Sequence, residues 1–145
     1  MSFKKILVPI DGSTYSAKAL RTATEIAQKH ESEIVILACM RKEDVGAWYY
    51  SDPKINQHII RKAKEFAKQS ISKLEESITK KGVNVTSGVI EVKSLVHGIT
   101  DFADSKKVDL IVMGSHGRTG FKKMLLGSVS NGVVQQAKQP VLIVK

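Results

Sequence analysis

The chain has 145 residues, a length that suits one domain and allows a sizeable core without metal or disulfide support. Hydrophobic residues make up 42% and charged residues 26%, as in ordinary globular proteins, and the formal net charge is +9 at pH 7. No apolar run approaches the roughly 20 residues that a membrane helix needs, and the single Cys39 excludes an internal disulfide, so we expect a cytoplasmic protein without a membrane partner.

Short β-branched runs alternate with helical patterns along the chain. This alternation predicts an α/β fold in which helices cover both faces of a parallel sheet. Residues 6–10 are expected to form a buried first strand, followed by a helix that Ser13 or Thr14 caps. Residues 34–40 are nearly all apolar and predict a second strand that is covered on both faces.

Residues 41–57 predict the one long irregular segment, which contains Trp48, Tyr49 and Tyr50. A connection of this length in a compact domain is usually functional or disordered. The three aromatic residues are compatible with a lid over a ligand, with a contact between subunits, or with a loop that is simply folded down.

The second half of the chain continues the alternation. A helix of some 25 residues is expected to carry Phe66 on its apolar stripe, and Gly88 is expected to mark a bulge or turn in the third strand. Gly132 indicates a close helix or subunit contact inside the last helix. We expect five strands and four helices in one domain, 1–145; the remaining elements are a third strand over 83–92, a short helix near 96–105, a fourth strand over 108–113, a helix over about 128–138 and a strand over 141–144.

The most informative stretch is residues 114–128, directly after the fourth strand. Glycines at a strand exit let the backbone approach a ligand closely. A Gly-Ser pair that opens a helix presents unpaired N–H groups and the positive end of the helix dipole. With Arg118, Lys122 and Lys123 between them, these features predict a cradle for a phosphate chain, although the three cations are also compatible with solvated loop charges.

Spacing excludes two familiar phosphate loops. A P-loop needs Gly-Lys followed by Ser or Thr, whereas Gly120 precedes Phe121. The dinucleotide fingerprint needs Gly-x-Gly-x-x-Gly, whereas Gly114, Gly117 and Gly120 are evenly spaced. Neither loop describes this chain.

The remaining pattern, Gly-x2-Gly-x9-Gly-Ser, resembles the nucleotide-binding signature of the universal stress protein family. Residues 4–13, 108–114 and 140–144 also resemble that family's first, fourth and last strands, so the resemblance covers nearly the whole chain. It implies an open, Rossmann-like sheet of the adenine nucleotide alpha hydrolase type, with strand order 3-2-1-4-5.

Ligands of open α/β sheets bind beyond the carboxyl ends of the strands, where the strand order reverses. The implied order places Asp11 and Gly114 at that point. A carboxylate repels phosphates, so Asp11 suits the ribose or base end, or serves only as a turn former or helix cap. The hydroxyl groups of Ser128 and Ser130 are expected to be further phosphate donors, or Ser128 is only a helix cap.

The resemblance implies ATP as the ligand, with Mg²⁺ bridging its phosphates. It assigns the first strand end to nucleoside contacts, the backbone near Cys39 to the adenine edge, and the glycine segment to ribose and phosphates. The predicted ATP-binding residues are Pro9, Ile10, Asp11, Cys39, Met113, Gly114, His116, Gly117, Arg118, Gly127, Ser128, Val129 and Ser130.

The family's nucleotide binders resemble switches or sensors in stress responses. The resemblance therefore implies such a role, together with a homodimer formed through the last strand, Val141, Leu142, Ile143 and Val144. No catalytic residue is assigned, because no water-activating carboxylate can be identified and His116 has no local carboxylate or nucleophile. The alternative is a slow ATPase or nucleotidyl-transfer enzyme of the same architecture.

The basic segment 54–81 supports a third hypothesis. It holds eight cations against three anions, which predicts either a solvated helix face or attraction to a polyanion such as nucleic acid. Its one aromatic residue, Phe66, is expected on the apolar stripe, where no base can stack on it. We therefore expect an adenine nucleotide rather than nucleic acid as the partner.

Overall fold

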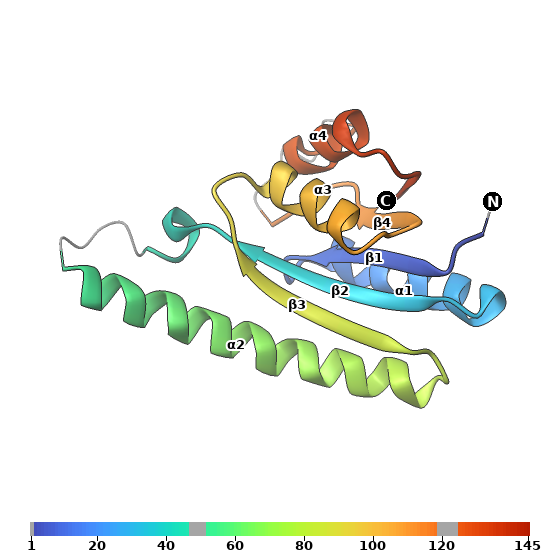
Figure 1. Ribbon diagram of the computed structural model, residues 1–145, viewed down its shortest axis with the longest axis horizontal. Helices are drawn as coiled ribbons and strands as arrows, with labels where there is room; N and C mark the ends of the chain where they lie inside the picture. The colour runs from blue at the N-terminus through green and yellow to red at the C-terminus, as the bar shows by residue number, and fades with distance from the viewer. Residues whose placement is uncertain (1, 47–51, 119–124) are drawn as a thin grey trace.

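The computed structural model describes residues 2–46, 52–118 and 125–145. Five parallel strands form one sheet with the order β3-β2-β1-β4-β5, which confirms the predicted fold class and strand order (Figure 1). The strands are β1 (Lys5–Ile10), β2 (Glu33–Met40), β3 (Val85–Glu91), β4 (Leu110–Gly114) and β5 (Val141–Val144). The helices are α1 (Thr14–His30), α2 (Pro53–Lys80), α3 (Leu95–Ser105) and α4 (Ser128–Gln136), with a 3₁₀ helix η1 (Lys42–Val45) after β2.

Two hydrophobic cores cover the two faces of the sheet, because successive side chains of a strand point to opposite faces. Ile6 and Val8 of β1 pack in one core with residues of α1 and α2. Leu7 packs in the other core with residues of α3 and α4. The central strands β1 and β4 are therefore apolar at nearly every position, and polar chemistry is confined to their ends.

The segment over 41–57 is more regular than its sequence predicts. Residues 42–45 form η1, and α2 already begins at Pro53, with Asp52 accepting a hydrogen bond from the N–H of Lys54 as the helix cap. Proline is well suited to the first turn of a helix because its missing N–H is not needed there. The predicted aromatic segment, residues 48–50, lies outside the described residues.

Two expectations about side chains are wrong. Phe66 does not lie on a buried stripe of α2: it is 72% exposed, and the buried residues of this helix are Ile71 and Ile78. Gly88 makes neither a bulge nor a turn, because β3 pairs with β2 without interruption and Gly88 lies opposite Leu37. A β-carbon at Gly88 would lie 3.4 Å from the ring of Phe102, which is an ordinary van der Waals contact.

None of the helices in the described ranges combines the length and the apolar character needed to cross a membrane.

Candidate functional site

A cavity of about 720 Å³ lies at the carboxyl end of the sheet. Its walls come from the ends of β1, β2 and β4, from η1, from the first turns of α1 and α4, from the first two turns of α3, and from the loop after β4. Because β1 and β4 are neighbours while β1 also pairs with β2, this is the point where the strand order reverses. The volume falls within the roughly 300–1,000 Å³ of typical small-molecule sites.

Every residue of the predicted site lines this one cavity. The chain brings them there from positions as far apart as 9 and 130, because the strand ends and the start of α4 meet at the same edge of the sheet. The residues are Pro9, Ile10, Asp11, Cys39, Met113, Gly114, His116, Gly117, Arg118, Gly127, Ser128, Val129 and Ser130. Lys122 and Lys123, the other cations expected near the phosphates, fall outside the described ranges.

The start of α4 differs from the starts of the other α-helices in the described ranges. Side-chain oxygens of Ser13, Asp52 and Ser94 cap α1, α2 and α3, whereas α4 has Gly127 at its N-cap and no side-chain cap. Ser128 is the first residue of the helix, so the alternative that it is only the cap is wrong. A helix end without a side-chain cap satisfies its N–H groups with water or with a ligand.

The hydrogen bonds around α4 show which of its N–H groups point outward. The N–H of Gly127 donates to the Ser115 carbonyl at 2.7 Å, and the first helical bond runs from the Asn131 N–H to the Gly127 carbonyl at 2.9 Å. Among the described residues, the N–H groups of residues 128–130 have no acceptor. These three groups border the cavity, and they form the anion-binding geometry of a helix N-terminus.

The hydroxyl of Ser130 serves the loop rather than the cavity. It is buried and lies within hydrogen-bond distance of the Ser115 carbonyl, at 2.7 Å, and of the Gly127 carbonyl, at 3.1 Å. Its single proton is therefore engaged inside the protein, and the expected donation of this hydroxyl to a phosphate does not fit the geometry. The two bonds hold the start of α4 against the segment that follows β4.

Asp11 closes a turn and also faces the glycine loop. Its Oδ1 accepts a hydrogen bond from the N–H of Ser13 at 2.9 Å, so the turn-forming role expected for it is present. A β-carbon at Gly117 would lie 2.8 Å from the other oxygen, Oδ2. The carboxylate therefore occupies the space that the missing side chain of Gly117 leaves open.

Cys39 and His116 have defined surroundings in the cavity. Burial raises the pKa of the Cys39 thiol to about 12, so this side chain is a neutral, apolar part of the wall at physiological pH. Nδ1 of His116 lies 2.9 Å from Oγ of Ser115, and its ring centroid lies 5.3 Å from that of Tyr15. These contacts orient the imidazole at the cavity edge.

Sequence reasoning missed seven residues of the cavity wall. Hydrophobic spacing placed the residues of α3 in a helix but gave no sign that one end of that helix borders a ligand site. The residues after β2 have no periodic pattern, so nothing in the sequence marked them. The seven are Ser16, Met40, Arg41, Asp44, Val45, Leu95 and Ile99.

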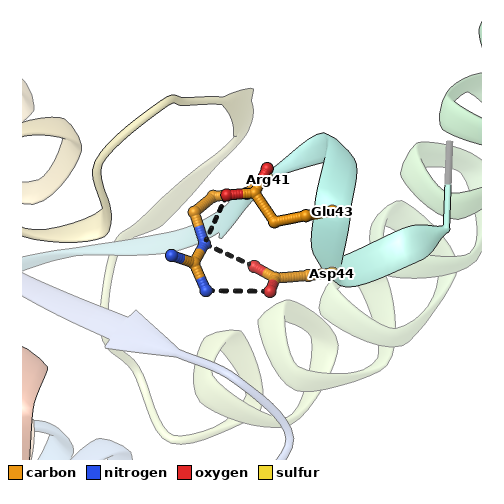
Figure 2. Close-up of polar contacts among 3 residues, drawn as sticks. All are labelled: Arg41, Glu43 and Asp44. Carbon is orange, nitrogen blue, oxygen red and sulfur yellow. Dashed lines mark hydrogen bonds and ion pairs between the residues drawn. The ribbon is translucent and has the colours of Figure 1, made fainter. Parts of the chain in front are cut away.

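Arg41 and Asp44 form the one ion pair found between described residues of the cavity wall (Figure 2). Nε and Nη2 of Arg41 donate to the two carboxylate oxygens of Asp44, each at 2.9 Å. The hydrogen bond from Arg41 lowers the pKa of Asp44, and the same bond raises the pKa of Arg41. Asp44 is thus a carboxylate across the physiological range.

The described residues contain no cluster of three or more His, Cys, Asp or Glu side chains that could hold a metal ion. Mg²⁺ in nucleotide sites takes much of its coordination from phosphates and water and only one or two carboxylates from the protein. Such an ion therefore needs few ligands from the protein.

Comparisons with known proteins agree with this geometry. The sequence profile of the universal stress protein family matches residues 2–145. The universal stress protein YxiE of Bacillus subtilis is 37% identical over 149 residues, which cover 99% of each chain. The solved structure of protein MJ0577 of Methanocaldococcus jannaschii is 28% identical, has a TM-score of 0.88 and covers 100% of this chain and 97% of its own.

A universal stress protein of Archaeoglobus fulgidus, solved in complex with dAMP, shares the fold at 24% identity, with a TM-score of 0.68 and full coverage of both chains. The family profile and the relatives match nearly the whole chain. The chain belongs to the universal stress protein family.

Proposed function

We propose that the cavity binds ATP and that the protein acts as a nucleotide-dependent switch or sensor in a stress response. The observation that carries this proposal is the meeting of the glycine loop with three outward N–H groups of α4 in one cavity. The complex of a family member with dAMP supports an adenine nucleotide as the ligand class.

The wall suggests how such a ligand lies. Apolar side chains gather near β2 and α3, where Met40, Val45 and Leu95 suit a nucleobase. The N–H groups of α4 and the cation of Arg118 suit phosphates at the other side. Asp11 lies between these regions at the end of β1, so we assign it to the ribose hydroxyl groups.

Mg²⁺ fits the same arrangement when it comes with the phosphates. Asp44 is paired with Arg41 and Asp11 is assigned to the ribose, so we infer that phosphate oxygens and water hold the ion. When bound with the phosphates, Mg²⁺ would neutralise part of their charge. In this proposal the N–H groups of the chain position the phosphates, and its carboxylates repel them.

We further propose that the protein works in the cytoplasm as a homodimer of single domains joined through β5. In the described residues β5 pairs with β4 along one edge only, and Leu142 on this strand is 38% exposed. Pairing of two such edges satisfies backbone groups that are otherwise left to water.

Titration of the purified protein with ATP, with and without Mg²⁺, tests the proposal by calorimetry, and phosphate release measured in parallel separates a switch from a slow ATPase. We expect one nucleotide per chain and no sustained phosphate release. Sustained turnover would favour the enzyme alternative, and a lack of nucleotide binding would overturn the proposal.

A matched pair of glycine variants locates the ligand. Gly117→Ala places a β-carbon 2.8 Å from Oδ2 of Asp11, a side-chain atom that can shift, so the protein should fold but lose about tenfold or more in ATP affinity. Gly88→Ala, in β3 and away from the cavity, is the control and should bind as the wild type does. Equal binding by Gly117→Ala and the wild type would contradict the assignment of the loop.

A second candidate, polyanion binding by α2, gains one observation from the structure. The exposed ring of Phe66 is available for base stacking, which the sequence argued against. The helix also carries an exposed cation one turn earlier, Lys62, which is paired with Glu65 at 3.7 Å. Binding of single-stranded DNA that falls steeply with salt and weakens in Phe66→Ala would favour this candidate.

A further inference from the structure

The 3₁₀ helix η1 forms a part of the cavity wall that neither the strand ends nor the glycine loop provides. Asp44 and Val45 of η1 line the cavity, together with Arg41 just before it. In the strand order, η1 follows β2, whereas α4 lies beyond β4 on the other side of β1. The η1 wall therefore borders the side assigned to the nucleobase and not the side assigned to the phosphates.

A bidentate ion pair between Arg41 and Asp44 spans the turn of η1. Arg41 reaches across the turn and donates two hydrogen bonds of 2.9 Å to Asp44, and its Nε also lies 3.7 Å from Oε1 of Glu43 (Figure 2). A planar guanidinium that contacts both oxygens of a carboxylate fixes orientation as well as distance. The pair holds η1 in one shape although its side chains are partly exposed.

A second group of charges ties η1 to its neighbours. Glu91, at the end of β3, lies 3.8 Å from the ammonium group of Lys42 in η1 and 3.8 Å from that of Lys64 in α2. These contacts are weaker than the Arg41 pair because each is longer and joins a single nitrogen to a single oxygen. The Arg41–Asp44 pair is thus the main polar restraint on the part of η1 that faces the cavity.

Charge also differs between the two sides of the cavity. Next to η1, the cations Arg41 and Lys42 balance the carboxylates of Glu43 and Asp44. At the other side, Arg118 and the α4 N–H groups attract anions. A polyphosphate is therefore stabilised at α4 and gains no net attraction at η1, which gives the ligand one direction in the cavity.

We propose that Arg41 and Asp44 are positioning residues for the side of the cavity assigned to the nucleobase. Their ion pair fixes η1, and η1, through its residue Val45, determines how tightly the nucleoside part of the ligand is held. This inference rests on the proposed function. It predicts that loss of the pair weakens binding of a nucleoside triphosphate without weakening binding of the bare polyphosphate, because the phosphates contact α4.

The experiment compares ATP with inorganic tripolyphosphate by calorimetry on the full chain. Asp44→Asn keeps the size of the side chain and removes its charge, so ATP affinity should fall about fivefold, as expected for loss of a partly exposed but two-pronged pair. Tripolyphosphate affinity should stay within about twofold of the wild-type value, because its contacts lie at α4. Glu43→Gln, which removes the carboxylate that lies 3.7 Å from Nε of Arg41, is the matched control and should leave both affinities unchanged.

A double-mutant cycle distinguishes positioning by the pair from separate effects of two residues. Arg41→Ala should weaken ATP binding as Asp44→Asn does, and the double variant should lose no more than either single variant. Unchanged ATP affinity in Asp44→Asn, or equal losses for ATP and tripolyphosphate, would overturn the inference while the proposed function stands. Failure of the wild-type protein to bind ATP would overturn both.

Discussion

At the scale of single residues, the motif glycines have different physical reasons to be glycine. A β-carbon at Gly114 would lie 2.7 Å from Cβ and 2.9 Å from the carbonyl carbon of Tyr15, so this glycine lets β4 pack against the start of α1. At Gly127 the nearest atom would be Cα of His116, at 3.3 Å. Of the three, Gly117 alone faces only a movable side-chain oxygen, which makes it the position where substitution reports on ligand binding rather than on folding.

Cys39 provides a test of the polarity of the wall. Because burial raises its pKa to about 12, almost no thiolate exists at pH 8, and thiolate is the form that reacts with alkylating agents. Iodoacetamide should therefore modify native protein far more slowly than protein unfolded in urea, as followed by mass spectrometry. Similar rates in the two states would contradict the raised pKa of this half-buried thiol.

The raised pKa of the Cys39 thiol also affects the stability of the protein at high pH. The folded state keeps the Cys39 proton at a pH where the unfolded thiol, with a pKa near 9.0, has already lost it. The contribution of this thiol to stability is therefore fully present below about pH 9 and is lost as the pH rises towards 12. Cys39→Ala should reduce this alkaline destabilisation.

At the scale of elements, α4 presents its N-terminus to the cavity because α3 holds it closely. A β-carbon at Gly132 would lie 2.6 Å from Cγ2 and 3.2 Å from Cγ1 of Val96. The sequence predicts either a helix contact or a subunit contact at Gly132, and the contact with Val96 of α3 is the helix contact. The close approach lets two short helices share one core while the first turn of α4 stays directed at the ligand site.

Gly132→Ala tests this packing, because two effects oppose each other. Alanine favours the helix by up to about 1 kcal/mol, whereas overpacking against a stiff valine costs about 1–3 kcal/mol. Overpacking should win, so the free energy of unfolding in urea should fall by about 1 kcal/mol. Adding Val96→Ala should relieve the overpacking; a more stable Gly132→Ala protein would show that the helices separate without cost.

The elements also show what the sequence could predict. The sequence predicts strands and helices where the hydrophobic spacing is regular. It predicts residues of the cavity wall where a close approach requires glycine, as at Gly117. Phe66 was misplaced because the face of α2 that packs on the sheet follows Ala63, Ala67, Ile71 and Ile78, and Phe66 lies off this face. Arg41 and Asp44 were missed because an ion pair within a turn depends on backbone geometry that no spacing encodes.

At the scale of the whole molecule, the open edge of the sheet is the feature that matters for assembly. Leu142 on β5 is 38% exposed, although its neighbours in the strand are half-buried. Leu142→Arg should place a cation in the centre of the proposed β5 interface and raise the dimer dissociation constant at least about tenfold, as measured by analytical ultracentrifugation. Ile55→Arg, on α2 and 44% exposed, is the control. A monomeric wild-type protein, or a variant that dimerises equally well, would contradict assembly through β5.

The exposed first half of α2 has a consequence for how the molecule opens. The helix has 28 residues, but Ile71 and Ile78, its fully buried side chains, both lie in the second half, and Figure 1 shows it extending beyond the tip of β3. At 1.5 Å per residue it is about 42 Å long, whereas a seven-residue strand spans only about 23 Å. With so little core beneath them, the early turns should fray at a small free-energy cost, and their amide hydrogens should exchange with deuterium well before those near Ile78. We therefore expect melting of this helix to start at its amino end and to proceed towards the sheet.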